Sequence, residues 1–487
     1  MILSISVSIL KIIGGYMLGV LLFLVYYIFI LKLDYDTNKK NYSPFLILTF
    51  PYVAIIVVNN LIAVHWGFYK ISVSTITFLG ISFGLFLLGI LFYRFKNRIF
   101  RRKNVTDFVQ SIKLEYYQLK EKWVSKKTSP NKNSEKIHSR KQKKGENKEA
   151  VSKFEFYNMP AILKYAVICE GIITIRVLYI ILKYGFAFFA ADENEGYLMT
   201  GILGHLLLTL YVVIPILFYY WLRYKKNILF LISSLYGIGL FFLTFVKYHS
   251  ICLIVLIYIF IVCEDKKYLK KGIIIIASTC ILAFILSYSV TFISRGTAKD
   301  VDISFYIYHL WKYVGGSVIN DNHIFTDGIR IDVSFFFKIG TILFALPNMF
   351  INKIFGTQFF VMESLPMLQV ADMEERSNVV DFIGYMYPSK GEFLEIVCFG
   401  IFMIGFGFLS QHFYACNEKA KKGFYLPTSV YLTFFCFFSF FSTYGTLSTV
   451  WEILVMSYII PHFFRKDSMK EMKRLIKDKT IKEKADV

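Results

Sequence analysis

The stretch Thr200–Leu222 reads TGILGHLLLTLYVVIPILFYYWL and contains no aspartate, glutamate, lysine or arginine. About 20 apolar residues are the length that a helix needs to cross a hydrocarbon core of roughly 30 Å. Because lipid offers the backbone no hydrogen-bond partners, the amides of such a run must be satisfied within the segment itself, as they are in a helix. The stretch therefore predicts a transmembrane helix.

Comparable apolar runs recur along the chain of 487 residues, of which 56% are hydrophobic. Soluble globular proteins contain roughly 45–50% apolar residues. The sequence therefore predicts an all-α polytopic membrane protein with about 11 transmembrane helices. The predicted spans are 12–31, 44–63, 72–93, 161–189, 200–222, 228–246, 250–264, 272–293, 391–413, 424–442 and 446–464.

The charge distribution predicts the orientation of these spans. The net charge is +21, and segment 94–158 has 19 Lys/Arg against 7 Asp/Glu, whereas 294–390 has 8 against 10. Because lysine and arginine accumulate in cytoplasmic loops, we expect the N-terminus outside, the C-terminus in the cytoplasm and 294–390 outside. The basic excess is then explained by topology and by attraction to anionic membrane lipid. No nucleic-acid partner is expected.

The spans and charges together define six segments. They are 1–93, with spans 1–3; 94–158, a basic cytoplasmic insertion; 159–293, with spans 4–8; 294–390, a large late extracytoplasmic loop; 391–464, with spans 9–11; and 465–487, a basic cytoplasmic tail. The insertion is lysine-rich and low in complexity, so we predict that it is partly disordered. Within the outer loop, Lys338 and Pro347 interrupt the apolar run Val333–Phe355. This favours an interfacial or re-entrant helix over a twelfth span.

Several classes of site are not indicated by the sequence. The seven cysteines lie in apolar spans or at their edges, without a Cys-x-x-Cys pair or a disulfide framework. Neither a glycine-rich phosphate loop nor a His-Glu-x-x-His motif is present. The internal repeat that is typical of many secondary transporters is also missing from the sequence.

Arginine is the uncommon cation of this chain, with 12 residues against 43 lysines, and three of the twelve lie in the outer loop: Arg295, Arg330 and Arg376. The planar guanidinium group matches phosphate oxygens bidentately, which lysine cannot do. At a membrane surface, the phosphate ligand would be a lipid phosphate or pyrophosphate headgroup. The alternative is local ion pairing, of Arg330 with Asp327 or Asp332 and of Arg376 with Glu374 or Asp381.

Two charged residues, Glu170 and Arg176, lie inside the fourth predicted span. Charges at membrane depth are costly, and they usually mark functional sites or pair with a neighbouring helix. Lys247 and His249 lie in a short outer turn before the seventh span, where they would face the ligand or simply reach the membrane interface. Both readings stay open, and Arg176, Lys247 and His249 are candidate substrate-binding residues.

The outer loop contains two histidines, His309 and His323. His323 lies in a polar stretch, and imidazole can deprotonate a hydroxyl group near neutral pH. A structural role is the alternative for this residue. His309 follows an aromatic run, so we expect it to be packed.

The end of the outer loop, SNVVDFIGYMY at Ser377–Tyr387, is followed by the glycine-containing span Glu392–Gly407. The earlier segment Tyr306–Val318 combines tyrosines with small residues and follows Arg295. Together with the span pattern, these segments resemble the lipid-linked oligosaccharide repeat-unit polymerases, the Wzy type that makes O-antigen and capsule. The resemblance covers residues 230–464 and makes Asn378 and Tyr385 candidate substrate-binding residues.

The resemblance implies a membrane-embedded glycosyltransferase of the bacterial cytoplasmic membrane. Such an enzyme moves a growing glycan from undecaprenyl pyrophosphate onto a hydroxyl of the next lipid-linked repeat unit, at the outer face. Arg295 and Arg376 would stabilise the departing pyrophosphate, Arg330 would help to bind it, and His323 would be the base. No metal or other cofactor is expected. Expected partners besides membrane lipid are a chain-length regulator and a flippase.

Two departures from the family separate this chain from a full match. Lys247 and His249 stand where the family often has a Ser-Arg pair, and Pro388–Gly391 replaces an Asp-Phe-Gly segment. The alternatives are an O-antigen ligase-like transferase, a polysaccharide flippase or exporter, and a non-enzymatic membrane scaffold.

Overall fold

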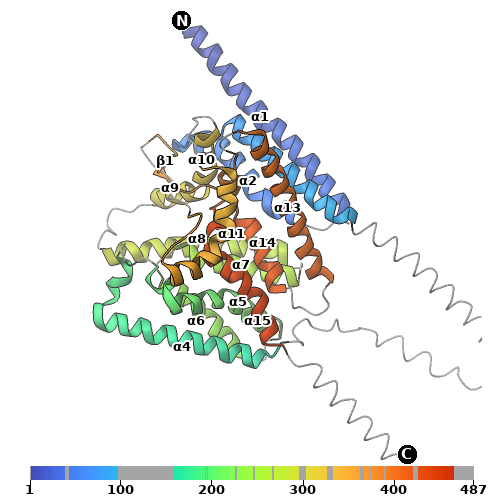
Figure 1. Cartoon of the computed structure of the whole chain (residues 1–487). Helices are drawn as coiled ribbons and strands as arrows, with labels where there is room; N and C mark the ends of the chain where they lie inside the picture. Colours follow the sequence, from blue (N-terminus) through green and yellow to red (C-terminus); the bar gives the residue numbers. More distant parts are fainter. Residues whose placement is uncertain are drawn as a thin grey trace, which may run out of the picture.

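The structure is a computed structural model that describes residues 2–38, 43–96, 157–191, 194, 196–224, 227–244, 247–265, 268–295, 303–325, 333–361, 367–372, 376–388, 391–419 and 426–465. The predicted disorder of the insertion and the basic tail after Arg465 therefore lie outside the described residues. The described part is mostly helical, as Figure 1 shows. Strands β1 (Leu368–Gln369) and β2 (Arg376–Ser377) form a small antiparallel sheet in which Gln369 lies opposite Arg376.

A helix coincides with each of the predicted spans. These helices are α1 (Ile2–Thr37), α2 (Pro44–Leu61), the helix Val73–Lys96, α4 (Met159–Tyr184), α5 (Gly201–Tyr224), α6 (Ile228–Phe242), α7 (Lys247–Glu264), α8 (Tyr268–Arg295), α13 (Phe393–Lys419), α14 (Leu426–Phe438) and α15 (Ser448–Phe463). The residues between α8 and α13 form four further helices, α9 (Ile303–Val314), α10 (Gly316–Phe325), α11 (Phe335–Phe355) and α12 (Phe382–Tyr385).

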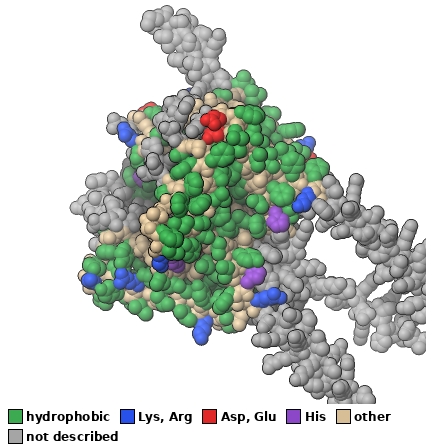
Figure 2. Space-filling model, viewed as in Figure 1, with side chains coloured by type: hydrophobic (Ala, Val, Ile, Leu, Met, Phe, Trp, Pro, Cys, Tyr) green, Lys and Arg blue, Asp and Glu red, His purple; other side chains and the backbone are tan. Residues whose placement is uncertain are grey.

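Eight helices in the described part of the chain are long and apolar enough to cross a membrane. Seven coincide with predicted spans and the eighth is α11, while α6, α7 and α14 are shorter apolar helices. Large apolar side chains cover much of the surface in Figure 2, and Leu182 is 87% exposed. So large an exposed apolar surface is unfavourable in water but not in contact with lipid. The prediction of an all-α polytopic membrane protein is confirmed at this level.

The buried apolar residues form two clusters. One is built mainly by α4 to α7 and includes Phe434 of α14, and the other is built mainly by α1, α2 and the helix Val73–Lys96 and includes Cys436 of α14. Figure 1 shows α9, α10 and β1 gathered at one end of the molecule and α4 and α6 toward the other. The second cluster also contains Val318 of α10 and Phe382 of α12, so the 294–390 segment is packed onto the helical core.

Local sequence signals set the ends of the helices around the site. Ser334 precedes α11 and its hydroxyl oxygen accepts a hydrogen bond from the Phe337 amide, while Gly356 ends this helix in the left-handed conformation with φ 66°. Asp381 caps α12 in the same way, since its carboxylate accepts from the amides of Ile383 and Gly384. Side chains of these types satisfy the unpaired amides at a helix start, and glycine adopts positive φ without strain.

Candidate functional site

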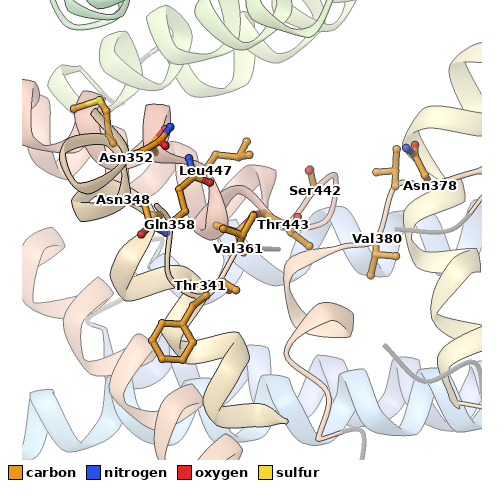
Figure 3. Close-up of a pocket in the computed structure, with 16 residues that line it drawn as sticks. Thr341, Asn348, Asn352, Gln358, Val361, Asn378, Val380, Ser442, Thr443 and Leu447 are labelled. Atoms are coloured by element: carbon orange, nitrogen blue, oxygen red, sulfur yellow. The ribbon is translucent and has the colours of Figure 1, made fainter. Parts of the chain in front are cut away.

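A pocket of about 690 Å³ opens beside α11. Figure 3 shows its walls, with Asn348 and Gln358 on one side, Asn378 and Val380 on the other, and Ser442 and Thr443 between them. Its lining residues are Thr341, Ala345, Asn348, Met349, Asn352, Gln358, Phe360, Val361, Asn378, Val379, Val380, Ser442, Thr443, Thr446, Leu447 and Ser448.

The first wall is built by α11 and the segment that follows it. Thr341, Ala345, Asn348 and Asn352 are spaced by four, three and four residues, so they form one stripe along the helix. The Asn348 side chain accepts a hydrogen bond from the Phe359 amide at 2.9 Å and donates one to the Phe359 carbonyl oxygen. This amide therefore folds the segment after α11 back along the helix.

Phe360 in this wall has a φ of 52°, a left-handed conformation that is rare for an aromatic residue. Its ring lies against Gly340, where an added Cβ would be 2.5 Å from the ring. Residues held in such conformations cost free energy of roughly 1–3 kcal/mol and gather at binding and catalytic sites. The first wall therefore holds a strained residue at the pocket surface.

The second wall is the extended chain from Asn378 to Val380, and α10 holds it in place. The Asn320 side-chain amide donates to the carbonyl oxygens of Ser377, at 3.0 Å, and Val379, at 2.8 Å. Asn320 is fully buried, so its bond to Ser377 is protected from water, while the bond to Val379 is partly buried. The third side of the pocket is formed by the connection between α14 and α15 and by the start of α15, which supply Ser442, Thr443, Thr446, Leu447 and Ser448.

The lining side chains are amides, hydroxyls and apolar groups, and none of the described lining residues is charged. Asparagine, glutamine, serine and threonine both donate and accept hydrogen bonds, as the hydroxyls of a sugar ring do. A cavity of this size with several polar groups among apolar ones is typical of a small-molecule site. An uncharged, hydroxylated ligand fits this chemistry best.

Arg376, in β2, is two residues before the lining residue Asn378. Exposure alternates along the chain here, with Arg376 exposed, Ser377 buried and Asn378 exposed. In extended chain, residues two apart share a face and are separated by about 7 Å. The exposed guanidinium is therefore on the same face as the lining residue Asn378. The alternative pairing of Arg376 with Asp381 is wrong, because Asp381 is fully buried and bonded to other groups.

A buried carboxyl pair, Asp321 and Asp381, lies directly behind the second wall. Tyr52 donates to Asp381 Oδ1 at 3.0 Å, and the amides of Ile383 and Gly384 donate to the same oxygen at 2.7 and 2.9 Å. Burial, first, and the charge of Asp381, second, hold the pKa of Asp321 well above its ordinary value. Burial also raises the pKa of Asp381, while its hydrogen-bond donors oppose that shift.

Two of the predicted substrate residues lie at the pocket. Asn378 lines it, whereas Tyr385 is almost fully buried behind the lining, with its hydroxyl 3.2 Å from the hydroxyl oxygen of Thr341. Arg330 lies outside the described residues, and Arg295 is the last residue of α8 with its side chain outside the described part. The structure thus brings Asn378, Tyr385 and Arg376 into one region.

The predicted base His323 does not line the pocket. Its Nε2 is 2.6 Å from the carbonyl oxygen of Gln369 in β1, so this nitrogen carries a proton and donates it. Nε2 is therefore unsuited to act as a base in this geometry. His309 is packed as predicted, with its ring stacked on Phe305 at 4.9 Å.

The charged residues of the fourth span each pair with a neighbouring element, as one of the two readings predicted. Ser233 of α6 donates to Glu170 at 2.8 Å, and Arg176 donates to the Tyr197 hydroxyl at 2.6 Å. Neither residue lines the pocket.

The predicted short turn at Lys247 and His249 is wrong, because both residues belong to the first turn of α7. His249 is buried, with its Nδ1 2.7 Å from the Tyr211 hydroxyl, and it does not line the pocket. The side chain of Lys247 lies outside the described part.

Sequence reasoning missed most of the pocket and the carboxyl pair. The stripe Thr341, Ala345, Asn348 and Asn352 was a readable signal, because polar residues at helical spacing interrupt an otherwise apolar helix. No local sequence pattern indicates that Asp321 and Asp381 lie together, because the two residues are 60 positions apart.

Comparison with known proteins gave no match to any family model, curated protein or solved structure.

Proposed function

We propose that the protein is a membrane-embedded glycosyltransferase that polymerises oligosaccharide repeat units carried on undecaprenyl pyrophosphate. The observation that carries this proposal is the uncharged, amide- and hydroxyl-lined pocket with Arg376 on the same face as its lining residue Asn378. A lipid-linked oligosaccharide has the two corresponding parts, an uncharged hydroxylated glycan and a charged pyrophosphate. The sequence resemblance to repeat-unit polymerases supports the same substrate.

In the proposed reaction, the bond between the anomeric carbon of the growing glycan and the pyrophosphate oxygen breaks. A bond forms between that carbon and a hydroxyl oxygen of the incoming repeat unit, and the hydroxyl proton is released. Negative charge develops on the departing pyrophosphate, where the Arg376 guanidinium stabilises it. The pocket amides, such as Asn352 and Asn378, orient the glycan by hydrogen bonds.

The proposed orientation is consistent with this reaction. With the N-terminus outside and the C-terminus in the cytoplasm, the 294–390 segment lies at the outer face, and so does the connection between α14 and α15. These are the segments that build the pocket. The proposed location is the bacterial cytoplasmic membrane, with α11 lying as an interfacial or re-entrant helix.

The test compares lipid-linked intermediates in cells that express the wild type, Arg376→Ala and Asn378→Ala. Arg223→Ala is the matched control, because Arg223 bonds Tyr219 at the far end of α5. We expect single lipid-linked repeats to accumulate in the two site variants and long polymer in the control. Retention of lipid-linked polymer would instead indicate a ligase. Unchanged polymer in both site variants would refute the assignment of this pocket.

A further inference from the structure

The carboxyl pair behind the second wall has a closely packed, water-excluded setting. Asp321 comes from α10 and Asp381 precedes α12, and both side chains are 0% exposed. Gly384 lies against Asp321, since an added Cβ at this position would overlap the Asp321 carboxyl oxygens. The chain approaches the carboxyl group so closely that only glycine fits there.

The hydrogen bonds of the two carboxyls are unequal. Asp381 Oδ1 accepts three, from Tyr52 and from the amides of Ile383 and Gly384. Asp381 Oδ2 and both oxygens of Asp321 receive no hydrogen from any described donor. None of the described lysines, arginines or histidines forms an ion pair with either residue.

Two negative charges at this position would repel each other, and no described cation and no donor to Asp321 would compensate for that repulsion. One proton placed between the carboxyls removes the repulsion and gives two of the three remaining oxygens a hydrogen bond. Asp381, which already has three donors, is the better carboxylate, so Asp321 is the acid. The direction in which burial and Asp381 shift the pKa of Asp321 agrees with this assignment.

We propose that Asp321 and Asp381 share a single proton, carried by Asp321, and that this pair positions the Asn378–Val380 wall for its ligand. Asp381 directly follows that wall, and Asn320, beside Asp321, bonds the carbonyl oxygen of Val379. Helix α10 thus holds the wall through two adjacent side chains. The positioning role rests on the proposed function of the pocket, whereas the shared proton does not.

The shared proton is tested by infrared difference spectroscopy on the purified full-length protein, with pH as the perturbation. We expect a protonated carboxylic acid band that disappears in Asp321→Asn and persists, shifted, in Asp381→Asn. The exposed Asp372→Asn is the matched control and keeps the band unchanged. A band that is lost in Asp381→Asn but kept in Asp321→Asn would overturn the assignment. A wild type without any such band would overturn the shared proton itself.

The positioning role is tested by hydrogen exchange over residues 377–381 and by polymer formation in cells. An asparagine at position 321 donates to Asp381 as the acid does, so Asp321→Asn should keep exchange protection and polymer length within about threefold. Asp321→Ala leaves Asp381 without this donor and should lower protection about tenfold or more, with loss of long polymer.

These readouts separate the two proposals. If Asp321→Ala loses hydrogen-exchange protection but makes polymer of unchanged length, the positioning role is overturned. The shared proton, which the infrared band tests, is unaffected by that result. Equal loss of protection in Asp321→Asn and Asp321→Ala would overturn the donor role of Asp321. If Arg376→Ala and Asn378→Ala also leave polymer unchanged, the proposed function fails independently of the infrared result.

Discussion

Asn320→Ala should loosen the second wall of the pocket without unfolding the helical core. The substitution removes two hydrogen bonds, to the carbonyl oxygens of Ser377 and Val379. Net losses of about 1 kcal/mol per bond, with added cost for the carbonyls left unpaired, give about 3 kcal/mol. The side-chain oxygen Oδ1 of Asn320 has no partner in the described part of the chain, so its removal offsets roughly 1 kcal/mol of this loss.

The remaining 2 kcal/mol or so corresponds to a roughly 30-fold loss of hydrogen-exchange protection over residues 377–380. Mass-spectrometric hydrogen exchange on the protein in detergent measures this change. Asn322→Ala is the matched control, because Asn322 lies on the same helix but bonds Ser72 and Thr75 instead. Equal exchange in the two variants, or an unchanged 377–380 segment in Asn320→Ala, would refute the reasoning.

Three further predictions concern stability. Above the ordinary pKa of an aspartate, the unfolded chain has lost the Asp321 proton, whereas the folded protein keeps it. The free energy of unfolding of the wild type should therefore fall as pH rises from 5 toward neutrality, by about 1.4 kcal/mol per pH unit relative to Asp321→Asn. Parallel pH profiles of the two proteins in denaturant unfolding would contradict this. Gly384→Ala should destabilise by about 1–3 kcal/mol through overlap with Asp321, and an unchanged midpoint of thermal unfolding would argue against the close approach. Arg94→Ala leaves the buried Asp34 without its partner at 2.9 Å and should lower the free energy of unfolding by about 3–5 kcal/mol. The double variant Arg94→Ala/Asp34→Asn should recover part of that stability, and additive losses from the two substitutions would contradict the ion pair.

The helices could be predicted because each apolar run carries its own signal. Length and composition alone place Thr200–Leu222 in a helix, and α5 spans Gly201–Tyr224. Lys338 and Pro347 interrupt the apolar run of α11, and Lys338 is buried, with its amino group donating to the carbonyl oxygen of Tyr387 at 2.6 Å. A charge inside an apolar run is tolerated when a partner from elsewhere satisfies it, and the sequence does not show that partner.

The site could be predicted only in part, because its walls come from distant segments. Asn378 and Arg376 were found through a local motif and through the rarity of arginine. The pairing of α11 with the 442–448 connection depends on tertiary packing that no local pattern encodes. His323 was chosen for its chemistry, but its bond to Gln369 is set by the position of β1.

Reconstitution of the purified protein in liposomes with an undecaprenyl-pyrophosphate-linked repeat unit tests the proposed polymerase activity. We expect glycans longer than one repeat unit, with one undecaprenyl pyrophosphate released for each repeat added. Arg376→Ala and Asn378→Ala should abolish this lengthening, while Arg223→Ala should retain it. Movement of the lipid-linked sugar across the bilayer without any lengthening would rule out a polymerase.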